Sequence, residues 1–152
     1  MEECLFCKIA AGKIPIKRVY EDEHTVAFLD INPASEGHTL VIPKKHAATI
    51  MEMDEDDLKH LSSTVRKLSS HIMSVLKPEG INILQNNGKA AGQLVHHVHF
   101  HIIPRNEGDK ITIAFPRGQT DETGLETTKL KIAITSSGNK QQSHSVKGAF
   151  GF

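Results

Sequence analysis

The clearest pattern along the chain is a stretch of helical periodicity in its middle. Between residues 54 and 77 the apolar positions recur at three- and four-residue steps, behind an N-capping Asp54 and before the stop signal Pro78. The pattern predicts one long amphipathic helix. A short helix is expected at residues 5–11, where Gly12 closes it.

Short apolar segments bounded by polar turns lie on both sides of the long helix. Five of them are expected to be strands, at residues 19–21, 25–30, 39–43, 81–86 and 94–103. The last two are close enough in sequence to form a hairpin around a loop at residues 87–92. This order of elements predicts an α+β domain with an antiparallel sheet of about five strands, one long helix and one short helix.

The pattern weakens after Arg105. Residues 111–115 are compatible with another strand, and residues 125–134 fit a helix and a strand equally well. From Thr135 onward the Ser, Gly, Asn, Gln and Lys content indicates a loosely ordered tail. We therefore expect one folded domain at residues 1–110 and a variable, partly flexible segment at residues 111–152.

Charge and composition narrow the class of function. The chain has 152 residues, and its 18 Lys and Arg balance its 18 Asp and Glu, so no overall field favours nucleic acid or an anionic membrane. Trp is absent, which argues against a base-stacking surface. No apolar run approaches the roughly 20 residues of a membrane helix, and the acidic start does not resemble a signal peptide. A cytoplasmic protein without membrane or nucleic-acid partners is expected.

Candidate chemistry concentrates in the segment His97-Val98-His99-Phe100-His101. Side chains alternate in a strand, so the three imidazoles would project to one face and the apolar residues between them to the core. Such a ladder can fix the tautomer that a nucleophilic histidine requires. Two other interpretations are a polar, half-exposed strand face and a metal site. Neighbours on one face are about 7 Å apart, so all three cannot reach one ion.

Cys4 and Cys7 form the only other motif with distinct chemistry. Their spacing suits a metal clip, and a structural zinc site would need two further ligands, which the histidines must supply. The alternative is a reduced pair without metal. A thioredoxin-like role is not expected, because no βαβ pattern surrounds the motif.

Several separated motifs resemble the histidine triad (HIT) family, whose signature is His-x-His-x-His. The resemblance covers about the first 110 residues and implies the HIT-like fold and a homodimer. It includes Leu5-Phe6-Cys7-Lys8-Ile9, Ile14-Pro15, Val19-Tyr20-Glu21-Asp22, Ala27-Phe28-Leu29-Asp30-Ile31, Gly37-His38-Thr39-Leu40-Val41-Ile42-Pro43-Lys44-Lys45-His46, Asn86 and Gly92-Gln93.

The resemblance implies a nucleotide hydrolase acting on an AMP-X substrate. His99 would attack the α-phosphorus and form a nucleotidyl-histidine that water cleaves, while His101 would contact the phosphate or the leaving group. The implied purine-nucleotide contacts are Asp30 to the ribose, Ile31 to the base, Asn86 to the ribose or phosphate, Gln93 to phosphate oxygens, and loop amides up to Gly92.

The resemblance also implies a zinc site. Its ligands would be Cys4, Cys7, His46 and the first triad residue, His97, and its role would be structural. His38 is expected to be structural and His96 to be a packing or surface residue. The remaining histidines, His24, His60, His71 and His144, are expected to be solvated.

The substrate stays open between dinucleoside polyphosphates and nucleoside phosphoramidates. Pro104-Arg105 resembles the dinucleoside hydrolases and general bacterial members, and Leu94 stands where the phosphoramidase branch often has serine. A non-catalytic nucleotide-binding adaptor is one alternative function. A nucleotidyltransferase is another, although His101, where transferases carry glutamine, favours water as the acceptor.

Overall fold

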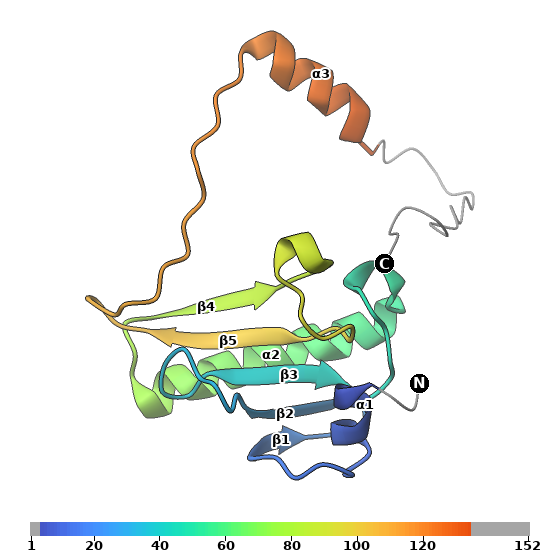
Figure 1. Cartoon of the computed structure of the whole chain (residues 1–152), viewed down its shortest axis with the longest axis vertical. Coiled ribbons are helices and arrows are strands. Elements are labelled where there is room, and N and C mark those ends of the chain that lie inside the picture. The colour runs from blue at the N-terminus through green and yellow to red at the C-terminus, as the bar shows by residue number, and fades with distance from the viewer. Residues whose placement is uncertain (1–3, 135–152) are drawn as a thin grey trace. The chain divides into compact units, whose positions relative to one another are not determined.

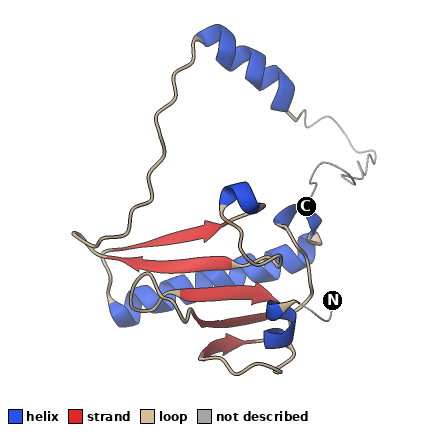
Figure 2. Ribbon diagram, in the orientation of Figure 1, coloured by secondary structure: helices blue, strands red, loops and turns tan. Residues whose placement is uncertain are grey.

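A computed structural model describes residues 4–134, and its main feature is a five-stranded antiparallel sheet (Figures 1 and 2). The strand order is β1-β2-β3-β5-β4, and β4 and β5 form the predicted hairpin. The prediction of an α+β domain with an antiparallel sheet of about five strands is confirmed. The strands are β1 (Arg18–Glu21), β2 (Thr25–Leu29), β3 (Thr39–Pro43), β4 (Gly80–Gln85) and β5 (Phe100–Arg105).

Two helices cover the two faces of this sheet unequally. The long helix α2 (Glu55–Leu76) lies along one face, where its apolar stripe packs against Val41 and Ile102 (Figure 1). The short helix α1 (Leu5–Ala10) packs on the alternate residues of the central strands, among them Leu40 and Ile42. Because α1 has only six residues, most of the second face stays uncovered, and this face carries the candidate site.

The histidine segment only partly follows the prediction. The alternation is confirmed, because Val98 and Ile102 are buried in the core beside α2. The strand boundary is wrong: β5 begins at Phe100, so His97 and His99 precede it. Pairing with β3 stops at Val41↔Phe100, since Pro43 further along has no N–H for the ladder.

The chain after β5 also differs from the expectation. Arg105, at the end of β5, pairs with Asp109 at 2.6 Å, and the compact unit ends at Ile111. Residues 112–120 form no strand, which corrects the expectation for residues 111–115. The ambiguous segment that follows is a helix, α3 (Glu122–Ile132), in a second unit that begins at Thr112. The tail expected from Thr135 lies outside the described residues.

The sequence predicts no membrane-spanning helix. Within residues 4–134, no helix is both long enough and apolar enough to cross a bilayer.

Candidate active site and metal centre

Two cavities meet at His99 and His101 on the open face of the sheet. One has a volume of about 390 Å³ and the other about 260 Å³. Their shared lining residues are His99, His101 and Leu94. The two imidazoles therefore stand between two separate binding volumes.

The larger cavity is mainly apolar. Its floor includes Phe6 and Ile9 of α1 and Phe28 of β2, all buried. Asp30 and Ile31, which follow β2, line it as well, and Ile31 is 89% exposed. The structure thus brings both predicted nucleoside-contacting residues to one cavity with the central histidines.

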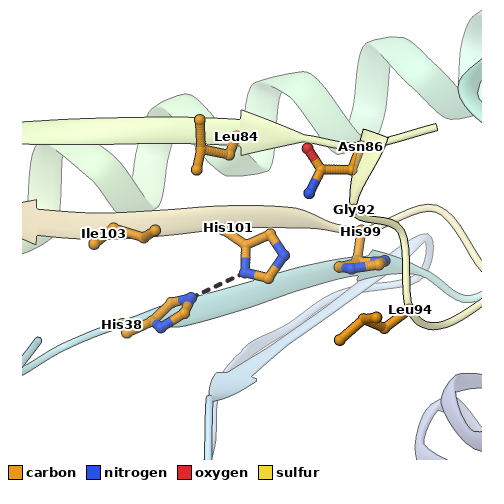
Figure 3. Close-up of a pocket in the computed structure, with 8 residues that line it drawn as sticks. All are labelled: His38, Leu84, Asn86, Gly92, Leu94, His99, His101 and Ile103. Carbon is orange, nitrogen blue, oxygen red and sulfur yellow. Dashed lines mark hydrogen bonds between the residues drawn. The ribbon is translucent and has the colours of Figure 1, made fainter. Parts of the chain in front are cut away.

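The smaller cavity extends along β4 and β5 (Figure 3). Asn86 and Gly92, two of the predicted nucleotide-binding residues, line it together with Leu84. Gly92 has a φ of +87°, a conformation that favours glycine. Because it has no side chain, the loop can turn beside Asn86.

His99 is held in one tautomer. Its Nδ1 lies 2.7 Å from the carbonyl oxygen of His97, and a carbonyl only accepts, so Nδ1 carries the proton. The lone pair is left on Nε2. Burial lowers the pKa of His99, against the opposing effects of this hydrogen bond and of Asp30. A neutral, oriented imidazole lines both cavities.

His101 receives its orientation from His38, which we expected to be structural. The amide of Ala34 donates to Nδ1 of His38 at 3.0 Å, so the proton of His38 lies on Nε2. That Nε2 lies 2.9 Å from Nδ1 of His101 (Figure 3), and His101 must therefore carry its own proton on Nε2. The arrangement gives His101 an N–H donor beside His99.

The electrostatics favour neutral forms for this pair too. Burial, together with the neighbouring His99 and His38, lowers the pKa of His101 to about 4, against the opposing effect of Asp30. Burial also lowers the pKa of His38, although the Asp30 carboxylate, 3.7 Å from its Nε2, opposes the shift. His38 was missed as a site residue. The signal that could have identified it is its position immediately before β3, two residues ahead of Leu40, which pairs with His101.

In the loop after β4, Gln93 and three of the amides are engaged in hydrogen bonds within the protein. Gln93 is 3% exposed and lines neither cavity; its side chain accepts from Gly88 N and donates to Ala48 O and Val95 O. The amides of Ala91, Gly92 and Gln93 all donate to carbonyls of the same loop. Because the Gln93 side chain bonds only to backbone groups of the protein, it supports the conformation of the loop and does not line either cavity.

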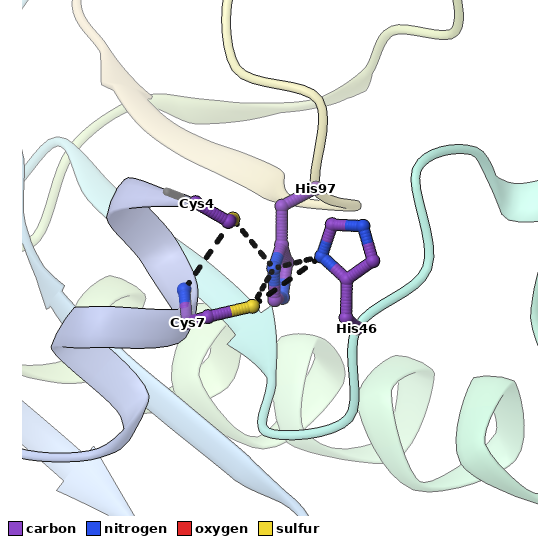
Figure 4. Close-up of side chains that lie close together, drawn as sticks. All are labelled: Cys4, Cys7, His46 and His97. Carbon is purple, nitrogen blue, oxygen red and sulfur yellow. Dashed lines mark hydrogen bonds between the residues drawn. The ribbon is translucent and has the colours of Figure 1, made fainter. Parts of the chain in front are cut away.

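The four predicted metal ligands converge beside the start of α1 (Figure 4). His97 Nδ1 lies 3.2 Å from His46 Nδ1 and 3.5 Å from the Sγ atoms of both Cys4 and Cys7. His46 Nδ1 lies 3.4 Å from Cys7 Sγ. A tetrahedral zinc site with bonds of about 2.0 Å to nitrogen and 2.3 Å to sulfur has ligand separations of roughly 3.3–3.8 Å. The donor set and its spacing therefore fit a zinc ion.

The tautomer of His97 is the one that a metal requires. Its Nε2 donates to the carbonyl oxygen of Pro43 at 2.9 Å, which leaves the Nδ1 lone pair facing the thiols. Burial, with the neighbouring Cys4 thiol, raises the pKa of Cys7 to about 11. A cation must therefore displace thiol protons when it binds.

Helix α1 connects this metal centre to the larger cavity. It contains Cys7, and Cys4 caps its start. The same helix contains Phe6, whose ring meets those of His97 and His99 edge-on at centroid distances of 5.9 and 5.2 Å. A displacement of α1 would therefore alter both the candidate metal site and the larger cavity.

The remaining described histidines belong to neither cluster and line neither cavity. His96 is exposed, as expected. His60 is exposed and His24 is half-buried, and their rings stack at a centroid distance of 3.8 Å, a contact that the sequence did not indicate. His24 precedes β2 and His60 lies on α2, so only tertiary packing brings them together.

Comparisons with known proteins agree with this geometry. The HIT domain family model matches residues 11–108. An uncharacterised HIT-like protein of Methanocaldococcus jannaschii is 54% identical, over 85% of this chain and 98% of its own. An adenosine 5′-monophosphoramidase of Schizosaccharomyces pombe is 46% identical, over 74% of this chain and 83% of its own.

Solved structures show the same relation. A protein of Streptococcus mutans superimposes with a TM-score of 0.83 at 43% identity, covering 87% of this chain and 84% of its own. A zinc-bound histidine triad protein of Mycobacterium smegmatis gives a TM-score of 0.68 at 36% identity, covering 82% and 89%. Together with the arrangement of His97, His99 and His101, these matches show that the chain belongs to the HIT family.

Proposed function

We propose that this protein is a nucleotide hydrolase that cleaves AMP-X substrates through a covalent nucleotidyl-His99 intermediate. The observation that carries the proposal is the His99 imidazole, neutral and anchored through Nδ1, with its Nε2 lone pair free beside two cavities. The adenosine 5′-monophosphoramidase of Schizosaccharomyces pombe supports the substrate class.

The reaction has two displacements. In the first, His99 Nε2 attacks the α-phosphorus and the bond from phosphorus to X breaks; the Nε2–H of His101 donates a hydrogen bond to the leaving group, which takes its proton from solvent. In the second, water attacks the phosphorus and releases a proton to solvent, and the bond from His99 to phosphorus breaks. The Nε2–H of His38 holds His101 in the required tautomer throughout.

The nucleoside would occupy the larger cavity. Asp30 would accept hydrogen bonds from the ribose hydroxyls, and Ile31 would pack on the purine. Asn86 would donate to the phosphate from the opposite side, and Gly92 keeps the loop clear of it. These residues all lie in the proposed domain at residues 1–110.

Cys4, Cys7, His46 and His97 would hold a structural zinc ion. Bound zinc supplies no reaction chemistry here; it cross-links α1, the segment after β3 and the triad. The zinc-bound homologue from Mycobacterium smegmatis supports this assignment. We further propose that the protein is a cytoplasmic homodimer, as the family resemblance implies, and that it has neither nucleic-acid nor membrane partners.

Turnover of an adenosine phosphoramidate and of diadenosine triphosphate tests the proposal. We expect wild type to cleave at least one of them, and His99→Ala to lose activity by a factor on the order of 10⁴ or more. His60→Ala serves as the matched histidine control, because His60 is exposed on α2. AMP binding without cleavage of either substrate would instead favour the adaptor function. Transfer of AMP to an added phosphate acceptor in preference to water would favour a nucleotidyltransferase.

A further inference from the structure

Cys4 and Cys7 are placed to react with each other as well as to bind a metal. Cys4 is the N-cap residue of α1 and Cys7 lies in its first turn, where the Cys7 amide donates to the Cys4 Sγ at 3.5 Å. The two Sγ atoms are within 4.8 Å of each other (Figure 4). Residues three apart on a helix have Cα atoms about 5 Å apart, a separation that disulfides span. A bond between the sulfurs can therefore form by side-chain rotation, with α1 intact.

Access and composition favour a disulfide over other products of thiol oxidation. Both cysteine side chains are half-buried, so a small oxidant can reach them from solvent. The chain has only these two cysteines, so each has the other as its one intramolecular partner. In the cytoplasm that we propose for this protein, such a pair is reduced at rest and forms a disulfide only transiently.

The position of the two thiols in the fold gives their oxidation a consequence for the metal centre. Both lie at the start of α1, whereas His46 follows β3 and His97 precedes β5. Oxidation therefore removes at once every ligand that α1 supplies. The two histidines that remain are too few for a four-coordinate zinc ion, and α1 loses its cross-link to the sheet.

The larger cavity depends on α1 more than the reactive imidazole does. Phe6 and Ile9 lie on α1 and form part of the floor of this cavity. His99 is anchored instead by the carbonyl of His97, whose own ring is tied to Pro43, and neither hydrogen bond involves an atom of α1. Oxidation should therefore weaken nucleoside binding more than it alters the chemistry at His99.

From these features we infer that Cys4 and Cys7 are a site of reversible oxidation, at which a hydroperoxide forms a disulfide, releases the metal and weakens nucleoside binding. The inference rests on the proposed zinc site and nucleotide binding, and it does not require hydrolysis.

The oxidation has two steps. One thiolate attacks the hydroperoxide, so that a sulfur–oxygen bond forms, the oxygen–oxygen bond breaks, and the departing oxygen takes a proton from solvent. The second thiolate then attacks the oxidised sulfur, so that the disulfide bond forms, the sulfur–oxygen bond breaks, and hydroxide leaves as water after it takes a proton from solvent. The two sulfurs lose two electrons, and the hydroperoxide gains them.

The full-length protein, loaded with zinc and treated with a small excess of hydrogen peroxide, tests the inference. We expect the zinc to pass to a chromophoric chelator while the intact protein mass falls by two hydrogen atoms. The Kd of AMP, measured by calorimetry, should rise about tenfold as the purine loses apolar contacts with Phe6 and Ile9. A thiol reductant with added zinc should restore all three quantities. It does not reverse oxidation of the exposed Met51 and Met73, so the reversal identifies the cysteines.

Cys4→Asp is the matched variant. An aspartate at this position can cap α1 and offers a carboxylate to the metal, but it cannot form the disulfide. We expect the variant to bind zinc, to release it about tenfold more slowly under the same peroxide treatment, and to keep its Kd for AMP throughout. Lys8→Ala, in the same helix, should respond to peroxide as wild type does.

Retention of zinc by peroxide-treated wild type would overturn the inference, as would release of zinc with oxygen added to the sulfurs and no reversal by the thiol. An unchanged Kd of AMP in the disulfide form would overturn it too, because the link from α1 to the larger cavity would then be absent. None of these measurements requires turnover. A wild type that cleaves neither substrate, yet shows the expected release of zinc and rise in Kd, would sink the hydrolase proposal and leave the oxidation site standing.

Discussion

His97 and His99 are two residues apart, buried, and each anchored to a carbonyl, yet they present opposite nitrogens. His97 donates through Nε2 to Pro43 and leaves Nδ1 facing two thiols. His99 donates through Nδ1 to the carbonyl of His97 and leaves Nε2 facing the cavities. The nitrogen that is tied to the backbone decides whether an imidazole is available to a metal or to phosphorus.

The two ends of the segment also depend on each other. The anchor of His99 is the backbone of His97, and α1 contributes both to the ligand set and to the floor of the larger cavity. The metal end comprises the candidate ligands, and the reactive end comprises His99 and His101. Four perturbations test whether one end can be disturbed without affecting the other.

Loss of the metal should have the largest effect. A metal at about 1,000 times its Kd stabilises a protein by about 4 kcal/mol, so chelation or Cys4→Ser should lower the Tm by about 10 °C or more. We expect AMP affinity to fall as well, because α1 is released. Metal analysis, calorimetry and AMP titration check this, with Lys8→Ala as the control in the same helix. A native protein that contains no metal would refute the metal centre.

The second largest effect is expected from His38→Ala, and it should be confined to the reactive end. Without the Nε2–H of His38, His101 can adopt the wrong tautomer, and we expect kcat to fall about 100-fold, which corresponds to about 2.7 kcal/mol. Metal content and AMP affinity should change little. His38→Gln retains an N–H donor and should recover most of kcat; failure of that rescue would argue against a positioning role.

The pH profile should lack the tenfold loss that histidines with ordinary pKa values would show. An imidazole with the ordinary pKa of 6.5 is about one-tenth neutral at pH 5.5. Burial lowers the pKa values of His99 and His101, and that of His101 is about 4, so His101 stays neutral as the pH falls from 8 to 5.5 and His99 stays neutral to a lower pH than an ordinary imidazole does. We expect kcat/KM to fall clearly less than tenfold over that interval and then to decline toward pH 4. A midpoint near 6.5 would contradict the assigned environment.

The stacked His24 and His60 pair should give the smallest effect. This pair lies outside both clusters, and His60 is exposed. We expect His60→Ala to change the free energy of unfolding by less than about 0.5 kcal/mol and to leave kcat and metal content unchanged. Denaturant unfolding measures the first quantity, and a larger change would mean that the β1–β2 turn depends on this contact.

Some of the site could be predicted because its signals are local in sequence. The alternation of His97, Val98, His99 and Phe100 indicated which side chains enter the core, and the core beside α2 contains Val98 as expected. Cys4 and Cys7 indicated a thiolate pair by spacing alone. Their histidine partners came from family resemblance, since no periodicity relates Cys4 to His97, 93 positions away.

Other features depend on groups that no local pattern relates. His38 joins His101 because β3 lies beside β5, and Ala34 fixes its tautomer across a loop. The side chain of Gln93 is buried because three backbone groups satisfy its amide: Gly88 N of its own loop, Val95 O, and Ala48 O in the segment after β3.

The sequence by itself determined the order of helices and strands up to residue 105, the alternation of the central segment between two opposite faces, and the residue types available for chemistry. These follow from periodicity and side-chain chemistry, which act within a few residues. Only the tertiary structure decided where β5 begins, which nitrogen of each histidine is free, and that two cavities meet at His99. Those properties depend on which carbonyls and strands lie next to each imidazole, and such neighbours are chosen by the packing of the whole sheet.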